Sequence, residues 1–200
     1  GLPKPHCWRG SACLRQAAGG PDAIVAMFER DHHRRIAIVL AALDGPRLLE
    51  HRCLFGGGTA MALRHGEFRE SVDIDFIVSD EQGWRDLRAA LTGPDKLAPI
   101  WRATHAALPT SEIRADTYGI RTRIDVGGAT VRFEIVREAR IDIDAPESDE
   151  VVCGVAALTR HDMIATKLMA NVDRWAVDGA FSRDLIDLAM MQPAGARLER

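Results

Sequence analysis

The sequence predicts an α/β fold in which a small sheet is flanked by helices. Three patterns carry this prediction: a glycine turn between an apolar run and a helix-competent run (residues 53–64), a β-branched and aromatic run (residues 72–78), and two alternating runs joined by two glycines (residues 120–135). Each has the period or the turn residues of the element it predicts. With 200 residues and 46% apolar content, the chain can bury one substantial core.

The glycine turn predicts a strand, a tight turn and the start of a helix. Gly57 and Gly58 let the backbone approach an anion because no Cβ intervenes, and the first amides of a helix have no partner of their own. Thr59 adds a hydroxyl at the helix start. This stretch is therefore able to hold phosphate.

The following strand carries two carboxylates. Asp73 and Asp75 are two residues apart, so they project on the same side of the strand while the apolar residues around them face the core. Neighbouring carboxylates repel each other and raise one pKa unless a cation lies between them. Because Mg²⁺ favours one or two carboxylates plus substrate phosphate oxygens, the turn and the carboxylate pair together indicate Mg-nucleotide chemistry.

Two alternating runs predict a β-hairpin with its turn at residues 127–128. In that register Ile120 opposes Ile135 on the apolar face. Glu134 then opposes Arg121 on the polar face.

Taken in order, these motifs resemble the beta-polymerase nucleotidyltransferase superfamily, and more narrowly the AbiEii/AbiGii-type nucleotidyltransferase toxins. The residues that carry the resemblance are Gly57-Gly58-Thr59-Ala60, Arg64, Ser71-Val72-Asp73-Ile74-Asp75, Lys167 and Arg183-Asp184-Leu185-Ile186-Asp187. It covers roughly residues 50–190, and the ordered set is fairly specific. The resemblance implies the nucleotidyltransferase fold, a small mixed, twisted sheet flanked by helices, with a C-terminal helical segment closing over the cleft.

The resemblance also implies a two-metal Mg²⁺ site held by Asp73 and Asp75 and by a third carboxylate on a neighbouring strand. Glu134 matches that position and would help to deprotonate the attacking hydroxyl. Asp125 is the alternative, and a simple cross-strand pair with Arg121 is the structural reading of Glu134.

For the nucleotide, the resemblance assigns the β- and γ-phosphates of a nucleoside triphosphate (NTP) to Gly57, Gly58 and Thr59. Lys167 and Arg64 would neutralise charge on the leaving pyrophosphate. Lys167 lies in a helix predicted over residues 160–175, where Thr159 and Asp162 resemble a capping box.

Asp184 and Asp187 are three residues apart and share one face of a short predicted helix. Two readings remain open. Either Asp184 acts directly in catalysis, or the two carboxylates form ion pairs with Arg174 and Arg183 and orient Lys167.

The implied reaction is transfer of NMP from an NTP to an RNA end, tRNA in particular, by a type IV toxin that a cognate antitoxin restrains. A small-molecule nucleotidyltransferase of the antibiotic-modifying type and a non-enzymatic nucleotide-binding protein remain as alternatives. A basic groove would favour RNA as the acceptor, and an acidic pocket would favour a cationic drug.

Composition sets further bounds. A formal charge of -3 argues against a large non-specific nucleic-acid surface, although local basic patches can occur. The four cysteines have no metal-site spacing and indicate reduced thiols in a cytoplasmic protein, and no apolar run has the length of a membrane span. We expect an N-terminal extension at 1–24, a nucleotidyltransferase core at 25–150 and a C-terminal helical segment at 151–200.

Helices are also predicted over residues 22–43 and from Ser79 or Asp80 to Leu91. In the first, residues 32–35 (His-His-Arg-Arg) are expected to be solvated. A second Asp-x-Asp motif within residues 141–144 lacks an upstream glycine turn, and we expect it to be a strand that leaves the sheet for a solvated loop.

Overall fold

A five-stranded mixed sheet organises the molecule. The computed structural model describes residues 26–102, 108–174 and 183–191. Across the sheet the strands are β1 (Leu54–Gly56), β2 (Asp73–Val78), β5 (Ala129–Arg137), β4 (Gly119–Val126) and β3 (Arg114–Ala115). β2 and β5 are parallel, and all other neighbours are antiparallel. The predicted small mixed sheet is confirmed.

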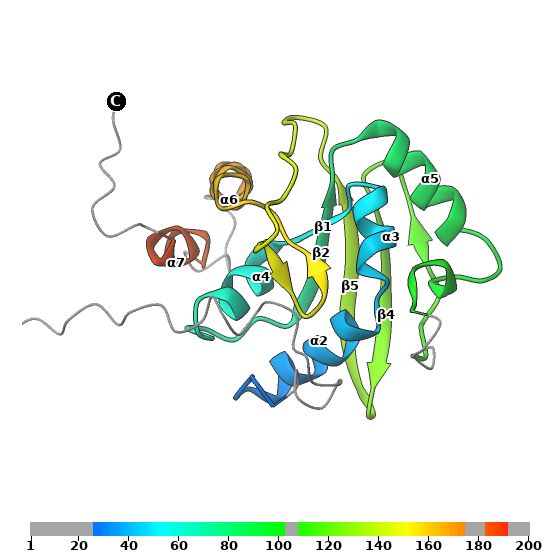
Figure 1. Ribbon diagram of the computed structural model, residues 1–200, viewed down its shortest axis with the longest axis horizontal. Helices are drawn as coiled ribbons and strands as arrows, with labels where there is room; N and C mark the ends of the chain where they lie inside the picture. Colours follow the sequence, from blue (N-terminus) through cyan, green and yellow to red (C-terminus); the bar gives the residue numbers. More distant parts are fainter. Residues whose placement is uncertain (1–25, 103–107, 175–182, 192–200) are drawn as a thin grey trace, which may run out of the picture.

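Helices lie on the core face and at one edge of this sheet. They are α2 (Asp31–Ala42), α3 (Gly45–Glu50), α4 (Gly57–Arg64), α5 (Glu81–Leu91), α6 (Arg160–Arg174) and α7 (Arg183–Met190), with a short 3₁₀ turn η1 (Ala98–Ile100). A two-stranded hairpin, β6 (Val151–Val152) and β7 (Val155–Ala156), precedes α6. Figure 1 shows α2 and α3 in front of β4 and β5, and α4, α6 and α7 together beside the edge formed by β1.

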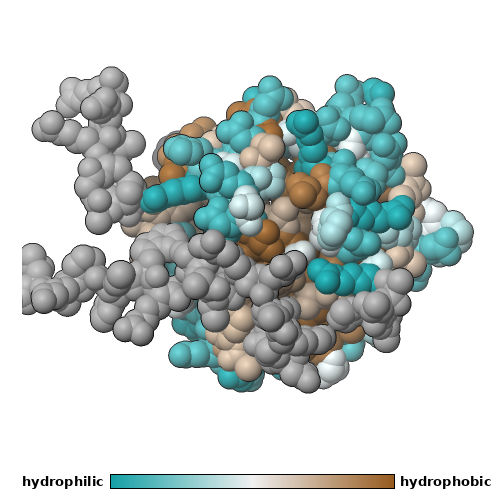
Figure 2. All heavy atoms as spheres, viewed as in Figure 1, coloured by the Kyte–Doolittle hydropathy of each residue, from teal (hydrophilic) through white to brown (hydrophobic). Residues whose placement is uncertain are grey.

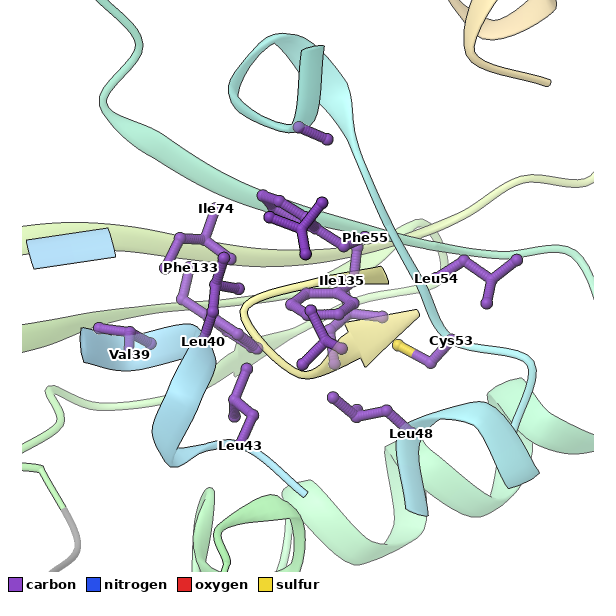
Figure 3. Close-up of a cluster of buried hydrophobic side chains, with 14 of the residues drawn as sticks. Val39, Leu40, Leu43, Leu48, Cys53, Leu54, Phe55, Ile74, Phe133 and Ile135 are labelled. Carbon is purple, nitrogen blue, oxygen red and sulfur yellow. The ribbon is translucent and has the colours of Figure 1, made fainter. Parts of the chain in front are cut away.

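The core lies between α2, α3 and the apolar face of the sheet. In Figure 3, Leu40 of α2 and Leu43, which directly follows this helix, lie on the side of the sheet that carries Phe133 and Ile135 of β5. All four side chains are essentially fully buried. Aromatic rings continue the contact across the central strands, because the Phe76 ring centroid lies 5.7 Å from that of Phe133. This packing fixes which face of each strand is left for polar residues.

The β4–β5 hairpin has the predicted turn and register. Gly127 and Gly128 both have positive φ, +61° and +81°, a conformation that glycine adopts without a Cβ clash. Ile120 opposes Ile135, as predicted. Because side chains alternate along each strand, this register places every charged residue of the hairpin interior on the face away from the core.

Two predicted helix starts are also confirmed. The Asp80 side chain caps α5 by accepting the Gly83 N–H at 2.7 Å, and Figure 2 shows hydrophilic side chains over this part of the surface. The Thr159 hydroxyl oxygen accepts the Asp162 N–H at 3.1 Å at the start of α6. Both helices therefore satisfy an otherwise unpaired backbone donor with a side chain.

The first predicted helix begins later than expected, and one of its histidines is buried. Residues 26–30 are not helical, α2 begins at Asp31, and residues 22–25 lie outside the described part of the chain. The prediction that His33 is solvated is wrong, because its side chain is 0% exposed and its Nδ1 lies 2.7 Å from the Glu67 carboxylate. Its Nε2 accepts the Ser71 N–H at 3.1 Å, which links α2 to the approach of β2.

The second Asp-x-Asp motif is not in a strand. Asp142 and Asp144 are exposed in an irregular segment after β5. The segment is held by backbone donors instead, since the Ile143 N–H donates to Ser79 Oγ and the Asp144 N–H to Asp162. The expected solvated loop is correct, and the expected strand is wrong.

Neither a disulfide nor a helix long and apolar enough to cross a membrane occurs in the described residues. Cys53 and Cys153 are free, and burial raises the pKa of both thiols, that of Cys153 to about 12. Cys7 and Cys13 lie outside the described residues, as does the predicted extension at 1–24.

Candidate active site

The predicted site residues form rows across the polar face of the sheet. Asp75 of β2 lies beside Gly56 of β1 on one side and Glu134 of β5 on the other. The same row continues through Arg121 of β4 to Arg114 of β3. A second row, two residues along the strands, joins Asp73, Arg132 and Arg123. Neighbouring strands are about 4.8 Å apart, so Asp75 and Glu134 are close neighbours.

Among the carboxylates of the described residues, Asp75 has the pKa that is raised most above its ordinary value. Burial, together with the nearby charges of Asp73 and Glu134, raises its pKa to about 6, although Lys167 and Arg132 act in the opposite direction. Among the described residues its side chain makes no hydrogen bond and no ion pair. A carboxylate in this position would gain most from a bound cation.

Gly57 leaves the space that Asp75 occupies. The glycine has φ +68°, and a Cβ built on it would overlap the Asp75 carboxylate. The start of α4 is thus in direct contact with the carboxylate strand. This contact brings the predicted phosphate turn and the predicted metal ligands together.

Asp73 is held by an arginine and its backbone by a threonine. The Arg132 Nε donates to Asp73 Oδ1 at 2.7 Å, and the second guanidinium nitrogen completes a bidentate pair. The buried Thr59 hydroxyl donates to the Asp73 backbone carbonyl and lies 2.8 Å from Ser71 Oγ. The Thr59 hydroxyl is therefore engaged within the protein, and its backbone amide is the group left for phosphate.

Glu134 faces Arg121, as the predicted register requires. The Arg121 Nε donates to it at 2.6 Å, and the same guanidinium also pairs with Asp116 at 2.8 Å. The competing candidate, Asp125, accepts the Gly128 N–H at the hairpin turn, two strands from β2. Only Glu134 of these two carboxylates lies directly beside Asp75.

Lys167 is buried at the junction of α6 and α7. It is only 8% exposed, and its Nζ lies 3.1 Å from Asp184 and 2.9 Å from Asp187. Burial opposes ionisation of Asp184, but hydrogen bonds from Lys167 and Arg174 hold its pKa below the usual range. The predicted common face of the two aspartates is confirmed, and both carboxylates contact the lysine.

A second cation ties this network to the glycine turn. Arg69 forms a bidentate pair with the fully buried Asp187, with both N···O distances 2.7 Å. A Cβ on Gly58 would overlap the Arg69 guanidinium and lie 3.4 Å from Asp187. Lys167, Arg69 and Arg174 carry three positive charges against two carboxylates. The network therefore keeps a residual positive charge near the start of α4.

Arg64 is not brought to the phosphate turn. It lies at the far end of α4, about 10 Å from Gly57 along the helix axis. Its guanidinium donates to the Leu158 carbonyl at 3.1 Å, and burial lowers its pKa against the opposing charges of Glu150 and Asp149. In this arrangement Arg64 ties α4 to the segment before α6.

The polar face of the sheet opens into a cleft of about 540 Å³. Asp73, Asp75 and Glu134 line one part of it. Its cationic lining consists of five arginines: Arg114, Arg121, Arg123, Arg132 and Arg174. The predicted third carboxylate and both members of the predicted pair therefore share one cavity.

The donor set fits a hard divalent cation only after two side chains turn. In the described part of the chain no three His, Cys, Asp or Glu side chains converge as a metal site, and Asp73 and Glu134 point to arginines. However, all three carboxylates come from adjacent strand positions, and burial together with the charges of Asp73 and Glu134 raises the pKa of Asp75. Three oxygen-donor side chains of this kind suit Mg²⁺.

Sequence reasoning missed Arg132 and Arg69. Their partners lie 59 and 118 residues away, so no local pattern pairs them. The alternation of Arg132 with Glu134 along β5 was the available signal, because it places both on one face.

A glycine turn at a helix start against a carboxylate strand, with a buried lysine in the adjoining network, is the arrangement of a nucleotidyltransferase. The model of the family described as "Nucleotidyl transferase AbiEii toxin, Type IV TA system" matches residues 39–200. The chain belongs to this family. The family resemblance inferred from the motifs and the predicted nucleotidyltransferase fold are thus confirmed.

Comparison with solved structures finds two crystal structures from Helicobacter pylori. JHP933 is 18% identical, with a TM-score of 0.45 and coverage of 80% of this chain and 66% of that one. The other, an inferred nucleotidyltransferase, is 18% identical, with a TM-score of 0.44 and coverage of 80% and 67%. This chain thus aligns to about two thirds of each length. A comparison with curated proteins returns no match.

Proposed function

We propose that this nucleotidyltransferase transfers NMP from an NTP to a hydroxyl of RNA, tRNA being the acceptor class. We further propose that it acts in the cytoplasm and that a cognate antitoxin protein restrains it. The observation that carries the proposal is the contact between Gly57 and Asp75, which supports a phosphate-binding role for the turn because the turn lies against a carboxylate whose pKa is raised by burial and by two neighbouring carboxylates.

The glycine turn would position the triphosphate. The first backbone amides of α4, those of Gly57, Gly58 and Thr59, would donate to phosphate oxygens. Lys167, held by Asp184 and Asp187, would place its charge near the leaving pyrophosphate. In this reading Asp184 is a positioning residue, and Arg64 supports α4 from its far end.

In the reaction, a bond forms between the acceptor oxygen and the α-phosphorus while the bond to the β-phosphate bridging oxygen breaks and pyrophosphate leaves. Asp73, Asp75 and Glu134 would hold Mg²⁺, which when bound neutralises charge on the reacting phosphates. Glu134 would accept the hydroxyl proton. For this it must leave Arg121, which keeps Asp116 as a partner.

The test is incubation of the purified protein with Mg²⁺, total RNA and each α-labelled NTP in turn. Label on RNA is expected with the wild type and absent with Asp75→Asn, a variant that removes the charge without removing a hydrogen bond. The matched control is Asp144→Asn, because Asp144 is the second aspartate of the other Asp-x-Asp motif, as Asp75 is of the first, and lies exposed outside the cleft. The proposal would be contradicted if the Asp75→Asn variant still labels RNA. It would also be contradicted if the wild type labels no RNA with any of the NTPs.

A further inference from the structure

Four arginines form a block on the polar face of the sheet, beside the carboxylates. The register places Arg114 directly opposite Arg121 and Arg123 directly opposite Arg132. Like charges directly opposite each other destabilise a sheet. Arrangements that break a local rule in this way are expected at functional sites.

Only half of this arginine block is neutralised. Arg121 pairs with Glu134 and Asp116, and Arg132 pairs with Asp73. Within the described residues, the Arg114 and Arg123 side chains make neither an ion pair nor a hydrogen bond, and both are exposed in the cleft. Glu112 also lines this part of the cleft.

The two unpaired arginines lie on the side of the carboxylates opposite the glycine turn. The turn follows β1, whereas Arg123 and Arg114 are on β4 and β3, two and three strands from β2. At about 4.8 Å per strand they lie roughly 10 Å and 14 Å from the carboxylate strand. An RNA strand that approaches the carboxylates from this side would pass these two arginines, whereas the phosphates of the NTP would lie at the turn on the other side.

We propose that Arg114 and Arg123 bind backbone phosphates of the acceptor RNA. This rests on the proposed function and adds to it a subsite separate from the NTP phosphates. Guanidinium groups suit phosphate because their planar donors match its oxygens. Arg114 and Arg123 would bind phosphate without taking part in bond formation or cleavage, so they are positioning residues for the acceptor strand.

The test compares the double variant R114Q/R123Q with the wild type. Glutamine removes charge without creating a new ion pair with Arg121 or Arg132. The matched control is R47Q/R88Q, two exposed arginines that do not line the cleft. The probe is a short single-stranded oligoribonucleotide, with binding measured between 50 and 200 mM salt.

Losing two phosphate contacts should lower the slope of log K against log salt by about 1.4, since each contact contributes about 0.7 for single strands. Binding by the wild type should then fall roughly sevenfold more over this range than binding by R114Q/R123Q. The double variant should also show a raised KM for RNA, with kcat and NTP-dependent thermal stabilisation unchanged. The control pair should keep the wild-type slope.

Four outcomes would overturn the proposal. The first three are a wild-type slope in R114Q/R123Q, an equal loss in the control pair, and loss of NTP-dependent stabilisation in the double variant. The fourth is that R114Q/R123Q loses binding to polyglutamate but not to RNA. That result would assign the arginine block to an acidic protein segment and would overturn the proposal. Failure of the proposed function is distinguishable, because the wild type itself would then transfer no label to RNA.

Discussion

Replacing Asp75 with asparagine should stabilise the folded protein at neutral pH while removing its transfer activity. In the folded state burial and two neighbouring carboxylates raise the Asp75 pKa from 3.8 to about 6. The ionised group therefore costs stability, and this cost is present above pH 6 and absent well below pH 3.8. Asparagine has nearly the same shape as aspartate but is uncharged, so it avoids the free-energy cost of a buried ionised carboxylate.

The size of the effect follows from the pKa values. A rise from 3.8 to about 6 corresponds to at most about 3 kcal/mol of unfolding free energy above pH 6. Asp75 is largely but not completely buried, so solvent screening reduces this figure to about 1–2 kcal/mol. For a chain of this size each kcal/mol shifts Tm by roughly 2–4 °C.

Urea unfolding in the presence of EDTA, from pH 4 to pH 8, measures this difference. The gap between Asp75→Asn and the wild type should be small at pH 4, grow as the pH rises through the folded-state pKa of about 6, and level off above about pH 7. Asp144→Asn, at an exposed site, should remain within about 0.5 kcal/mol of the wild type throughout. An Asp75→Asn variant that is less stable than the wild type at pH 7.5, or a gap independent of pH, would refute the reasoning.

Four further results are expected. Glu134→Gln should abolish label transfer to RNA while Asp125→Asn retains it, and the reverse result would assign the third carboxylate to Asp125. Gly58→Ala places a Cβ against Arg69 and should cost about 1–3 kcal/mol in urea unfolding; an unchanged midpoint would show that the arginine moves freely. Asp187→Asn removes a fully buried ion-pair partner and should cost about 3–5 kcal/mol by the same measurement, whereas a neutral effect would mean that the network is solvated. Wild type with Mg²⁺ and the preferred NTP at 100 times Kd should gain about 2.7 kcal/mol, and a gain without Mg²⁺ would argue against a metal-dependent site.

The hairpin register was predictable because it rests on local rules. Side chains alternate with a period of two, and the glycine pair at Gly127 fixes the turn, so one choice of register leaves all apolar residues on one face. The same reasoning predicts that Glu134 lies opposite Arg121, as the structure shows. The match of Glu134 to Asp75 then required only that β5 lie beside β2.

Long-range partners were not predictable, because local rules do not determine which distant residues come into contact. His33 follows a pattern that fits a solvated helix surface, yet Glu67 and Ser71 satisfy both of its ring nitrogens inside the protein. Arg69 and Asp187 come together across 118 residues, and nothing in either local sequence selects the other. Charge and period identify residues that need a partner, but the packing of distant elements decides which partner they receive.

The two faces of β5 show how one strand can serve both stability and the proposed chemistry. Phe133 and Ile135 are buried against α2 and neighbouring strands, where they follow the packing rules of a sheet core. On the opposite face Arg132 lies beside another arginine, and Glu134 lies beside Asp75, both unfavourable placements. The ion pairs of Arg132 and Glu134 offset part of that cost in the absence of ligands. Ligands that neutralise the carboxylates and the arginines separately would replace these ion pairs. The like-charge neighbours on this face are therefore a reason to expect a metal-bound nucleotide at the carboxylates and a polyanion at the arginines.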